Sequence, residues 1–151
     1  MRELIENPAF KYYVYCAAAL TFNPLVLAGM TGGARGKYKS PATPEDEKLS
    51  GNPYRDDVAP EVARLIRAHR NALENVPLAL VAGLLYVLAG ASPNPTLGLM
   101  ATVAAARWLH SIFYLKAVQP WRTATFAVGA LATGAMLIHT VVLVAQAGGA
   151  P

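Results

Sequence analysis

The stretch that decides the fold is 67-RAHRNALE-74, followed after Asn75 by the apolar run 76-VPLALVAGLLYVLAGA-91. Polar and charged side chains therefore stand where a membrane-spanning helix is expected to begin. At helical spacing four of them fall at i, i+3, i+4 and i+7 and share one face: Arg67, Arg70, Asn71 and Glu74. A charged side chain near the bilayer centre costs at least ~2.5–3.5 kcal/mol. We therefore expect this face to point into a protein interior or a wet cleft that holds a small anionic ligand.

The composition of the chain is typical of an integral membrane protein. Of its 151 residues, 54% are hydrophobic and 15% are charged, whereas soluble domains average about 25% charged residues. The charges are also segregated, because none lies between residues 75 and 106 and none follows Arg122. A soluble helical bundle would need charged residues along all its outward faces.

The charge and the cysteine count exclude several classes of function. The net charge is +4, but the basic residues gather beside apolar runs and form no soluble basic stripe, so no nucleic-acid partner is indicated. Cys16 is the only cysteine, which leaves neither a disulfide framework nor a cysteine zinc site. No spacing of potential ligands predicts a metal centre.

Four apolar stretches each approach the ~20 residues needed to cross the hydrocarbon core of a bilayer. They predict an all-α protein, an integral membrane four-helix bundle that forms a single domain over residues 1–151. The predicted spans lie at about 12–30, 60–91, 96–117 and 123–147. Residues 31–59 combine glycine, proline and mixed charge, which predicts a polar loop. The segments 92–95 and 119–122 are predicted turns.

The distribution of lysine and arginine predicts the orientation of these spans. The first connection is rich in basic residues: Arg35, Lys37, Lys39, Lys48, Arg55 and Arg64. Lys116 and Arg122 occupy the third connection, while the 92–95 turn and the C-terminal segment have no basic residue. The positive-inside rule then places the first and third connections in the cytoplasm. A second polar face on the third span would lie at the same end as the segment 67–74: Arg107, His110 and Tyr114.

These residues resemble the signature of the MAPEG family, the membrane-associated proteins of eicosanoid and glutathione metabolism. The likeness rests on 67-RAHRN-71 with the following 73-LEN-75 and Pro77, and extends to 44-PED-46, 93-PNP-95 and the polar positions of the third and fourth spans. The resemblance implies a four-helix protomer that assembles as a homotrimer. It also implies that glutathione binds between neighbouring subunits, in an active site that faces the cytoplasm.

The resemblance also assigns roles residue by residue. Glutathione contacts fall on Arg35, Arg67, His69, Arg70, Asn71, Glu74, Arg107, His110 and Tyr114. Catalytic roles fall on Arg122 as the arginine that stabilises the thiolate, on Thr123 at the place of a serine, and on Asp46 as a loop acid near that arginine. Phe126 stands where the prostaglandin-synthesising members have a tyrosine, and Ala72 replaces an aspartate common in the motif. These departures are compatible with glutathione binding and argue against a prostaglandin substrate.

The chemistry of glutathione matches these residue types. Its two carboxylates suit bidentate capture by arginine, and its ammonium suits Glu74. Its thiol becomes a nucleophile only as a thiolate, which nearby positive charge and a helix N-terminus favour. Arg122 offers both, because it opens the fourth span. Thr123 is placed to donate a hydrogen bond to the sulfur.

Three functions are compatible with the sequence. The leading one is a glutathione transferase, with or without peroxidase activity, that acts on lipophilic electrophiles entering from the bilayer. The second is a glutathione-dependent isomerase of lipid peroxides. The third is a non-catalytic lipid-binding membrane protein, against which Arg122 argues. Each polar face also has a purely structural interpretation, as a salt-bridged helix end for the segment 67–74 and as an interhelix bond for Arg107 and His110.

Overall fold

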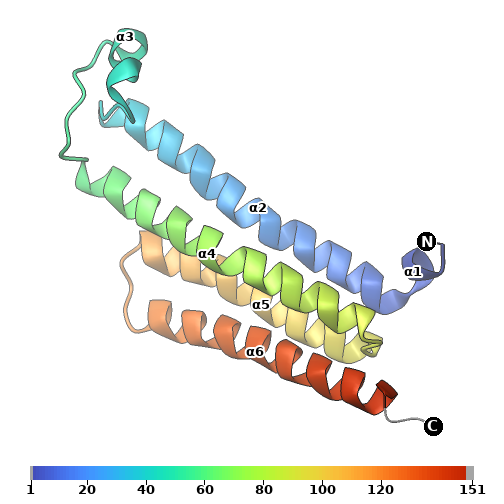
Figure 1. The fold of residues 1–151 in the computed structure, drawn as a ribbon. Coiled ribbons are helices and arrows are strands. Elements are labelled where there is room, and N and C mark those ends of the chain that lie inside the picture. The colour runs from blue at the N-terminus through green and yellow to red at the C-terminus, as the bar shows by residue number, and fades with distance from the viewer. Residues whose placement is uncertain (1, 149–151) are drawn as a thin grey trace.

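The structure, a computed structural model, describes residues 2–148 and is helical, with no strand in that range. Four long helices run side by side: α2 (Pro8–Lys37), α4 (Pro60–Leu88), α5 (Pro93–Leu115) and α6 (Trp121–Gly148) (Figure 1). Three short helices complete the described chain: α1 (Arg2–Glu6), η1 (Pro44–Asp46) and α3 (Glu47–Ser50). The prediction of an all-α protein is confirmed.

Three of the long helices, α2, α4 and α6, are long and apolar enough to cross a membrane. The fourth long helix, α5, has 23 residues. Its apolar sequence is interrupted by Arg107 and His110, and it does not meet the same criterion of length and hydropathy. Both side chains are buried, with 3% and 6% of their surfaces exposed. These two side chains therefore face neighbouring helices.

The helix ends differ from the predicted spans. α2 continues to Lys37, so Arg35 lies in its last turn and not in the loop. Basic side chains at that end interact favourably with the negative end of the helix dipole. α5 begins at Pro93, because proline is well tolerated in the first turn, where its missing N–H costs nothing. The segment 93–95 is thus the start of a helix, and residues 89–92 make the connection.

The interior of the bundle forms where small residues let the helices approach. α2 packs on α4 and α5, and α6 packs on α5 and α4. Gly83 permits the contact between α4 and α5, since a Cβ atom there would lie 2.5 Å from Met100 Sδ. The main cluster of buried residues comprises Leu20, Val76, Ala79, Ala82, Tyr86, Ala91, Met100, Val103, Ala132 and Met136.

Hydrogen bonds to α2 fix the rotation of α5. Trp108 Nε1 donates to the Ala19 carbonyl oxygen at 2.9 Å, and Ser111 Oγ donates to Asn23 Oδ1 at 3.1 Å. These contacts hold one face of α5 against α2. The other face, which carries His110, is thereby turned towards α6.

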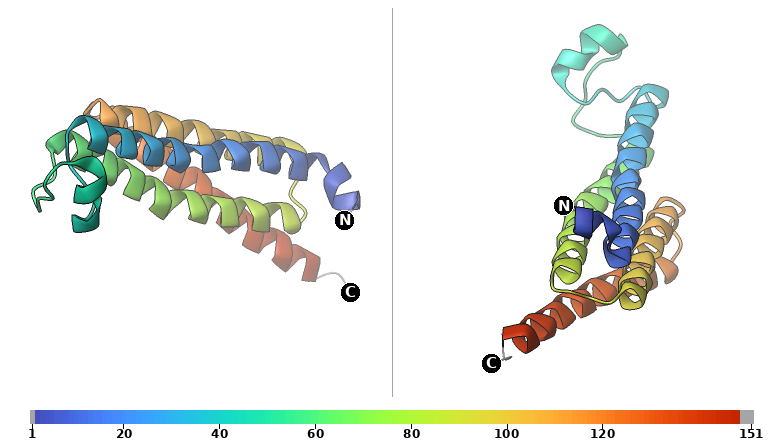
Figure 2. Two further views of the ribbon diagram at one scale, coloured as in Figure 1. Left: turned by 90° about the horizontal axis from the view of Figure 1, so that it is seen from above. Right: turned by 90° about the vertical axis from the view of Figure 1, so that its right-hand side faces the viewer.

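The antiparallel course of the helices brings the polar segments to one end of the bundle. The end of α2, the start of α4, the end of α5 and the start of α6 share that end, while α1 and the end of α6 lie at the other (Figures 1 and 2). The predicted convergence of the two polar faces is therefore confirmed. The orientation of this end relative to the cytoplasm stays a prediction.

Candidate active site

A polar pocket opens where the end of α5 meets the start of α6. It has a volume of about 220 Å³ and draws its lining from three helices: Asn71, His110, Tyr114, Arg122, Thr123 and Phe126. We call it the Arg122 pocket. It unites part of the predicted glutathione face of α4 with the predicted thiolate-stabilising arginine.

Arg122 is the second residue of α6, and its guanidinium is held from two sides. Its Cζ lies 4.9 Å from the centroid of the Tyr114 ring, within the range of a cation–π contact. On the other side lies the Gln119 side-chain amide. The hydrogen-bonding groups of this amide are satisfied when the amide oxygen faces the Arg122 guanidinium. Oε1 then accepts from Arg122 Nε at 3.1 Å and from Nη2 at 2.6 Å. The cation is therefore positioned at the positive end of the helix dipole.

Gln119 is a site residue that the sequence indicates only as part of a turn. In the same orientation its amide nitrogen donates to Thr123 Oγ1 at 3.1 Å. One side chain thus orients both Arg122 and Thr123. No helical periodicity could have found it, because Gln119 lies in the turn before α6 begins at Trp121.

His110 contributes a buried hydrogen-bonding atom to the pocket. Its Nδ1 lies 2.9 Å from the Arg122 carbonyl oxygen. Since a carbonyl oxygen only accepts, Nδ1 carries the proton and Nε2 of the neutral ring is an acceptor. Nε2 is buried and has no hydrogen-bond partner among residues 2–148. The ring is fixed between Tyr114 and Phe126, with centroid separations of 5.7 and 5.8 Å.

Asn71 supplies a second unpaired polar atom. Its Oδ1 is buried and, like His110 Nε2, has no partner within the described chain. Leaving a buried polar atom unpaired costs about 1–3 kcal/mol. The Arg122 pocket therefore combines a cation and a hydroxyl, and two buried unpaired acceptors belong to its lining residues. The cation and the hydroxyl suit one anionic group of a ligand.

The rest of the polar face of α4 is not enclosed by a single chain. Arg67, Arg70 and Glu74 are exposed, and His69 is half-buried. Arg70 Nε lies 3.0 Å from Glu74 Oε1, with 79% and 56% of the two side chains exposed. Such an i,i+4 pair contributes only about 0.3–0.5 kcal/mol. Within one chain this face, apart from Asn71, lies open on the surface, and its expected place in a protein interior or a wet cleft stays a prediction.

Arg35 and Asp46 lie apart from the Arg122 pocket and shape the loop. Arg35 Nη1 donates to the carbonyl oxygens of Ser40 and Pro41 at 3.3 and 3.2 Å. Asp46 Oδ2 accepts from the backbone N–H groups of residues 42 and 43, each at 3.1 Å. Both residues line a separate pocket of about 160 Å³. The expected neighbourhood of Asp46 and Arg122 does not occur within one chain.

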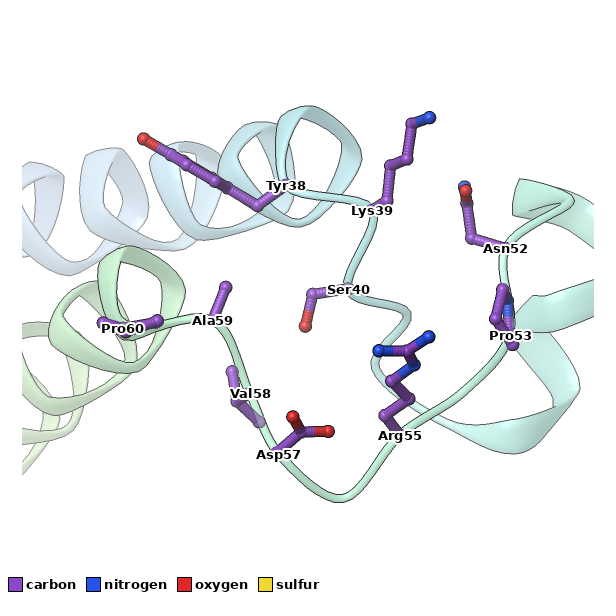
Figure 3. Close-up of a pocket in the computed structure, with 10 residues that line it drawn as sticks. All are labelled: Tyr38, Lys39, Ser40, Asn52, Pro53, Arg55, Asp57, Val58, Ala59 and Pro60. Atoms are coloured by element: carbon purple, nitrogen blue, oxygen red, sulfur yellow. The ribbon is translucent and has the colours of Figure 1, made fainter.

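A larger loop pocket holds none of the predicted site residues. It has a volume of about 390 Å³ and lies between the end of α2 and the segment that leads into α4. Figure 3 shows Arg55 and Asp57 on that segment, across the pocket from Ser40. This loop pocket is therefore distinct from the candidate active site.

Arg107 lines a different pocket from the other predicted glutathione contacts on α5. It is buried and lines a groove between α4 and α6 that shares no lining residue with the Arg122 pocket. Phe126 lies between the two sites, because its ring lines the Arg122 pocket and lies 5.1 Å from Arg107 Cζ.

The fold and the site together define a class: an all-helical chain with membrane-crossing helices and a cationic pocket at the start of its last helix. A family model described as the MAPEG family matches residues 13–142. Prostaglandin E synthase of Homo sapiens is 31% identical over 139 residues, which cover 90% of each chain. Microsomal glutathione S-transferase 1 of Homo sapiens is 30% identical over 137 residues, 85% of this chain and 86% of the relative. The protein therefore belongs to the MAPEG family.

Proposed function

We propose that this protein is a membrane-bound glutathione transferase, which joins the sulfur of glutathione to lipophilic electrophiles that enter from the bilayer. The observation that carries the proposal is the Arg122 guanidinium, oriented by Gln119 and Tyr114 at the start of α6 and adjacent to Thr123. Fixed positive charge aimed at a developing or existing anion is the main means by which such sites favour a thiolate. The similarity to a human microsomal glutathione S-transferase supports the same chemistry.

Each residue of the pocket has a role in this proposal. Arg122 stabilises the thiolate, and the Thr123 hydroxyl donates a hydrogen bond to the sulfur. Asn71 and His110, which line the same pocket, contact the tripeptide. In the reaction, the sulfur forms a bond to the electrophilic carbon with its own electron pair. A leaving group then departs with the electron pair of its bond, or an addition product takes up a proton from water.

We also propose that glutathione binds between copies of the chain in a homotrimer. The Arg122 pocket measures about 220 Å³, less than the ~300–1,000 Å³ typical of small-molecule sites. The exposed cations Arg67 and Arg70, with Glu74, are suited to the carboxylates and ammonium that one chain leaves unmatched. A second subunit would complete the site with its own α4 and with its Arg35, His69 and Asp46. In this assembly α5 crosses the membrane as the fourth span, and the site faces the cytoplasm as the basic residues predict.

A second candidate, a glutathione-dependent isomerase of lipid peroxides, is favoured by one observation. The human prostaglandin E synthase described above is similar to this chain over 90% of its length. The ring of Phe126 in the Arg122 pocket argues against it, because this position has no hydroxyl to hold a peroxide oxygen.

Two measurements on the purified protein in detergent test the proposal. Isothermal titration should detect glutathione binding, and 1-chloro-2,4-dinitrobenzene should be conjugated faster than in the absence of protein. Binding without conjugation, together with isomerisation of a lipid endoperoxide, would favour the second candidate. Absence of binding at millimolar glutathione would refute both and leave the lipid-binding alternative.

A further inference from the structure

The hydroxyl of Thr123 is bonded differently from those of the other threonines in the four long helices. Every other one donates its proton to the carbonyl oxygen four residues earlier in its own helix: Thr21, Thr31, Thr96, Thr102, Thr125, Thr133 and Thr140. A hydroxyl has one proton, so a threonine bonded in this way has none left for a ligand. Thr123 Oγ1 instead contacts the side chain of Gln119, at 3.1 Å.

The direction of the hydrogen bond between Gln119 and Thr123 follows from Arg122. A guanidinium has N–H donors and no acceptor, so the amide atom that faces it must be the oxygen. Gln119 Oε1 then accepts from Arg122 Nε and Nη2, and the amide nitrogen faces Thr123 Oγ1. Since an amide nitrogen only donates, the oxygen of Thr123 is the acceptor in this bond. The hydroxyl proton of Thr123 is therefore free for another acceptor.

The Thr123 hydroxyl and the Arg122 cation are presented to the same cavity. Both residues line the Arg122 pocket, whereas Gln119 is not among its lining residues. The two groups offer protons to whatever binds there, and a thiolate accepts such protons in strong, charge-assisted hydrogen bonds. A neutral thiol is only a weak acceptor and keeps its own proton. This arrangement therefore favours the thiolate over the thiol.

We propose that Gln119 is a positioning residue that sets the direction of the Thr123 hydroxyl. Arg122, Gln119 and Thr123 then form a relay of hydrogen bonds that ends in a proton directed at the bound sulfur. Each bond in such a chain polarises the next, so the charge of Arg122 also strengthens Thr123 as a donor. The inference deepens the proposed function and rests on it, because the anion at the end of the relay is the thiolate of glutathione.

The apparent pKa of the bound glutathione thiol, measured from thiolate absorbance against pH, tests the relay by a double-mutant cycle. With Gln119 present, Thr123→Val should raise this pKa by about 1–2 units, because a charge-assisted hydrogen bond to the sulfur is lost. Thr123→Ser keeps the hydroxyl and should keep the pKa of the unmodified protein. In a Gln119→Ala background, the hydroxyl should donate to the carbonyl of residue 119, as the other threonines do. Thr123→Val should then change the pKa little, and an equal shift in both backgrounds would overturn the proposal.

Gln119→Glu tests the direction of the bond with a side chain of the same shape. A carboxylate only accepts, so Thr123 would have to donate its proton to residue 119 and the sulfur would lose it. Thr123→Val should therefore have little further effect on the thiol pKa in this background as well. A full shift there would contradict the relay, even if Gln119→Ala fails to fold.

A control variant and the remaining pocket residues separate the relay from other effects. Thr102→Val removes an exposed hydroxyl that is already bonded to the Gly98 carbonyl and should leave the thiol pKa unchanged. His110 and Tyr114 are the other titratable groups that line the pocket, and they are the same in every variant. Absence of a thiolate band in the unmodified protein would refute the proposed function and the relay together. A normal band with equal shifts in both backgrounds would refute the relay alone.

Discussion

Replacing Arg122 by alanine removes the cation that the proposed mechanism needs most. A charge-assisted hydrogen bond contributes about 1.5–3 kcal/mol. Arg122 is half-buried, so solvent screens part of its charge and the lower end of that range applies. Turnover of 1-chloro-2,4-dinitrobenzene should therefore fall about 10-fold, the equivalent of about 1.4 kcal/mol. The affinity for glutathione should fall much less, because Asn71, His110 and the arginines of α4 would still hold the peptide.

The assay combines steady-state turnover with the ultraviolet absorbance of the bound thiolate. Both signals should decrease together in Arg122→Ala, because the pKa of the bound thiol would rise towards its free value. Arg122→Lys should retain part of each signal, since it keeps a charge and loses the planar fork. Lys116→Ala, which removes an exposed charge from the same connection, is the matched control and should have no effect. Full turnover with intact thiolate absorbance in Arg122→Ala would refute the assigned role.

The remaining predictions concern affinity, packing and topology. Gln119→Ala should lower turnover severalfold and have a smaller effect on glutathione affinity. An unchanged turnover rate would show that Gln119 does not position Arg122 and Thr123. Glu74→Ala should weaken glutathione by about 1.5–3 kcal/mol in titration calorimetry, although Glu74 is exposed in the single chain; an unchanged affinity would argue against a site shared between copies. Gly83→Val should lower the free energy of unfolding by about 1–3 kcal/mol, because the added methyl groups overpack the contact with Met100. A lower midpoint of thermal unfolding in detergent would report this loss. An unchanged midpoint would mean that Met100 moves aside. A cysteine at Ser92, with Cys16→Ser as background, should react with an impermeant thiol reagent only from the side opposite the cytoplasm; labelling from the cytoplasmic side would reverse the assigned orientation.

The helices and much of the pocket could be predicted from the sequence because their signals are local. Long apolar runs set the helices, and the spacing of Asn71, His110, Tyr114 and Arg122 placed polar residues on faces that meet at one end. The sequence also identified Arg122 as the residue that opens the last helix. These features depend on periodicity and on the order of elements along the chain, both of which are visible without tertiary contacts.

Features that depend on packing could not be predicted in this way. The spacing of Arg107 and His110 placed them on one face of α5, yet the packing of Phe126 and Gly129 assigns them to different cavities. Likewise, Arg70 and Asn71 belong to one polar stripe, but only Asn71 reaches the Arg122 pocket. A stripe on a helix is broad enough to face two neighbours, and only the positions of α5 and α6 decide which residue meets which.

The most direct test of the central claim is the ultraviolet difference spectrum of glutathione titrated into the protein at pH 7. Free glutathione is only a few per cent thiolate at this pH. If Arg122 and the start of α6 hold the sulfur as an anion, a thiolate band should grow with saturation and disappear on addition of an S-alkylated glutathione. Saturable binding with no thiolate band would contradict the claim, because the protein would then bind glutathione without activating it.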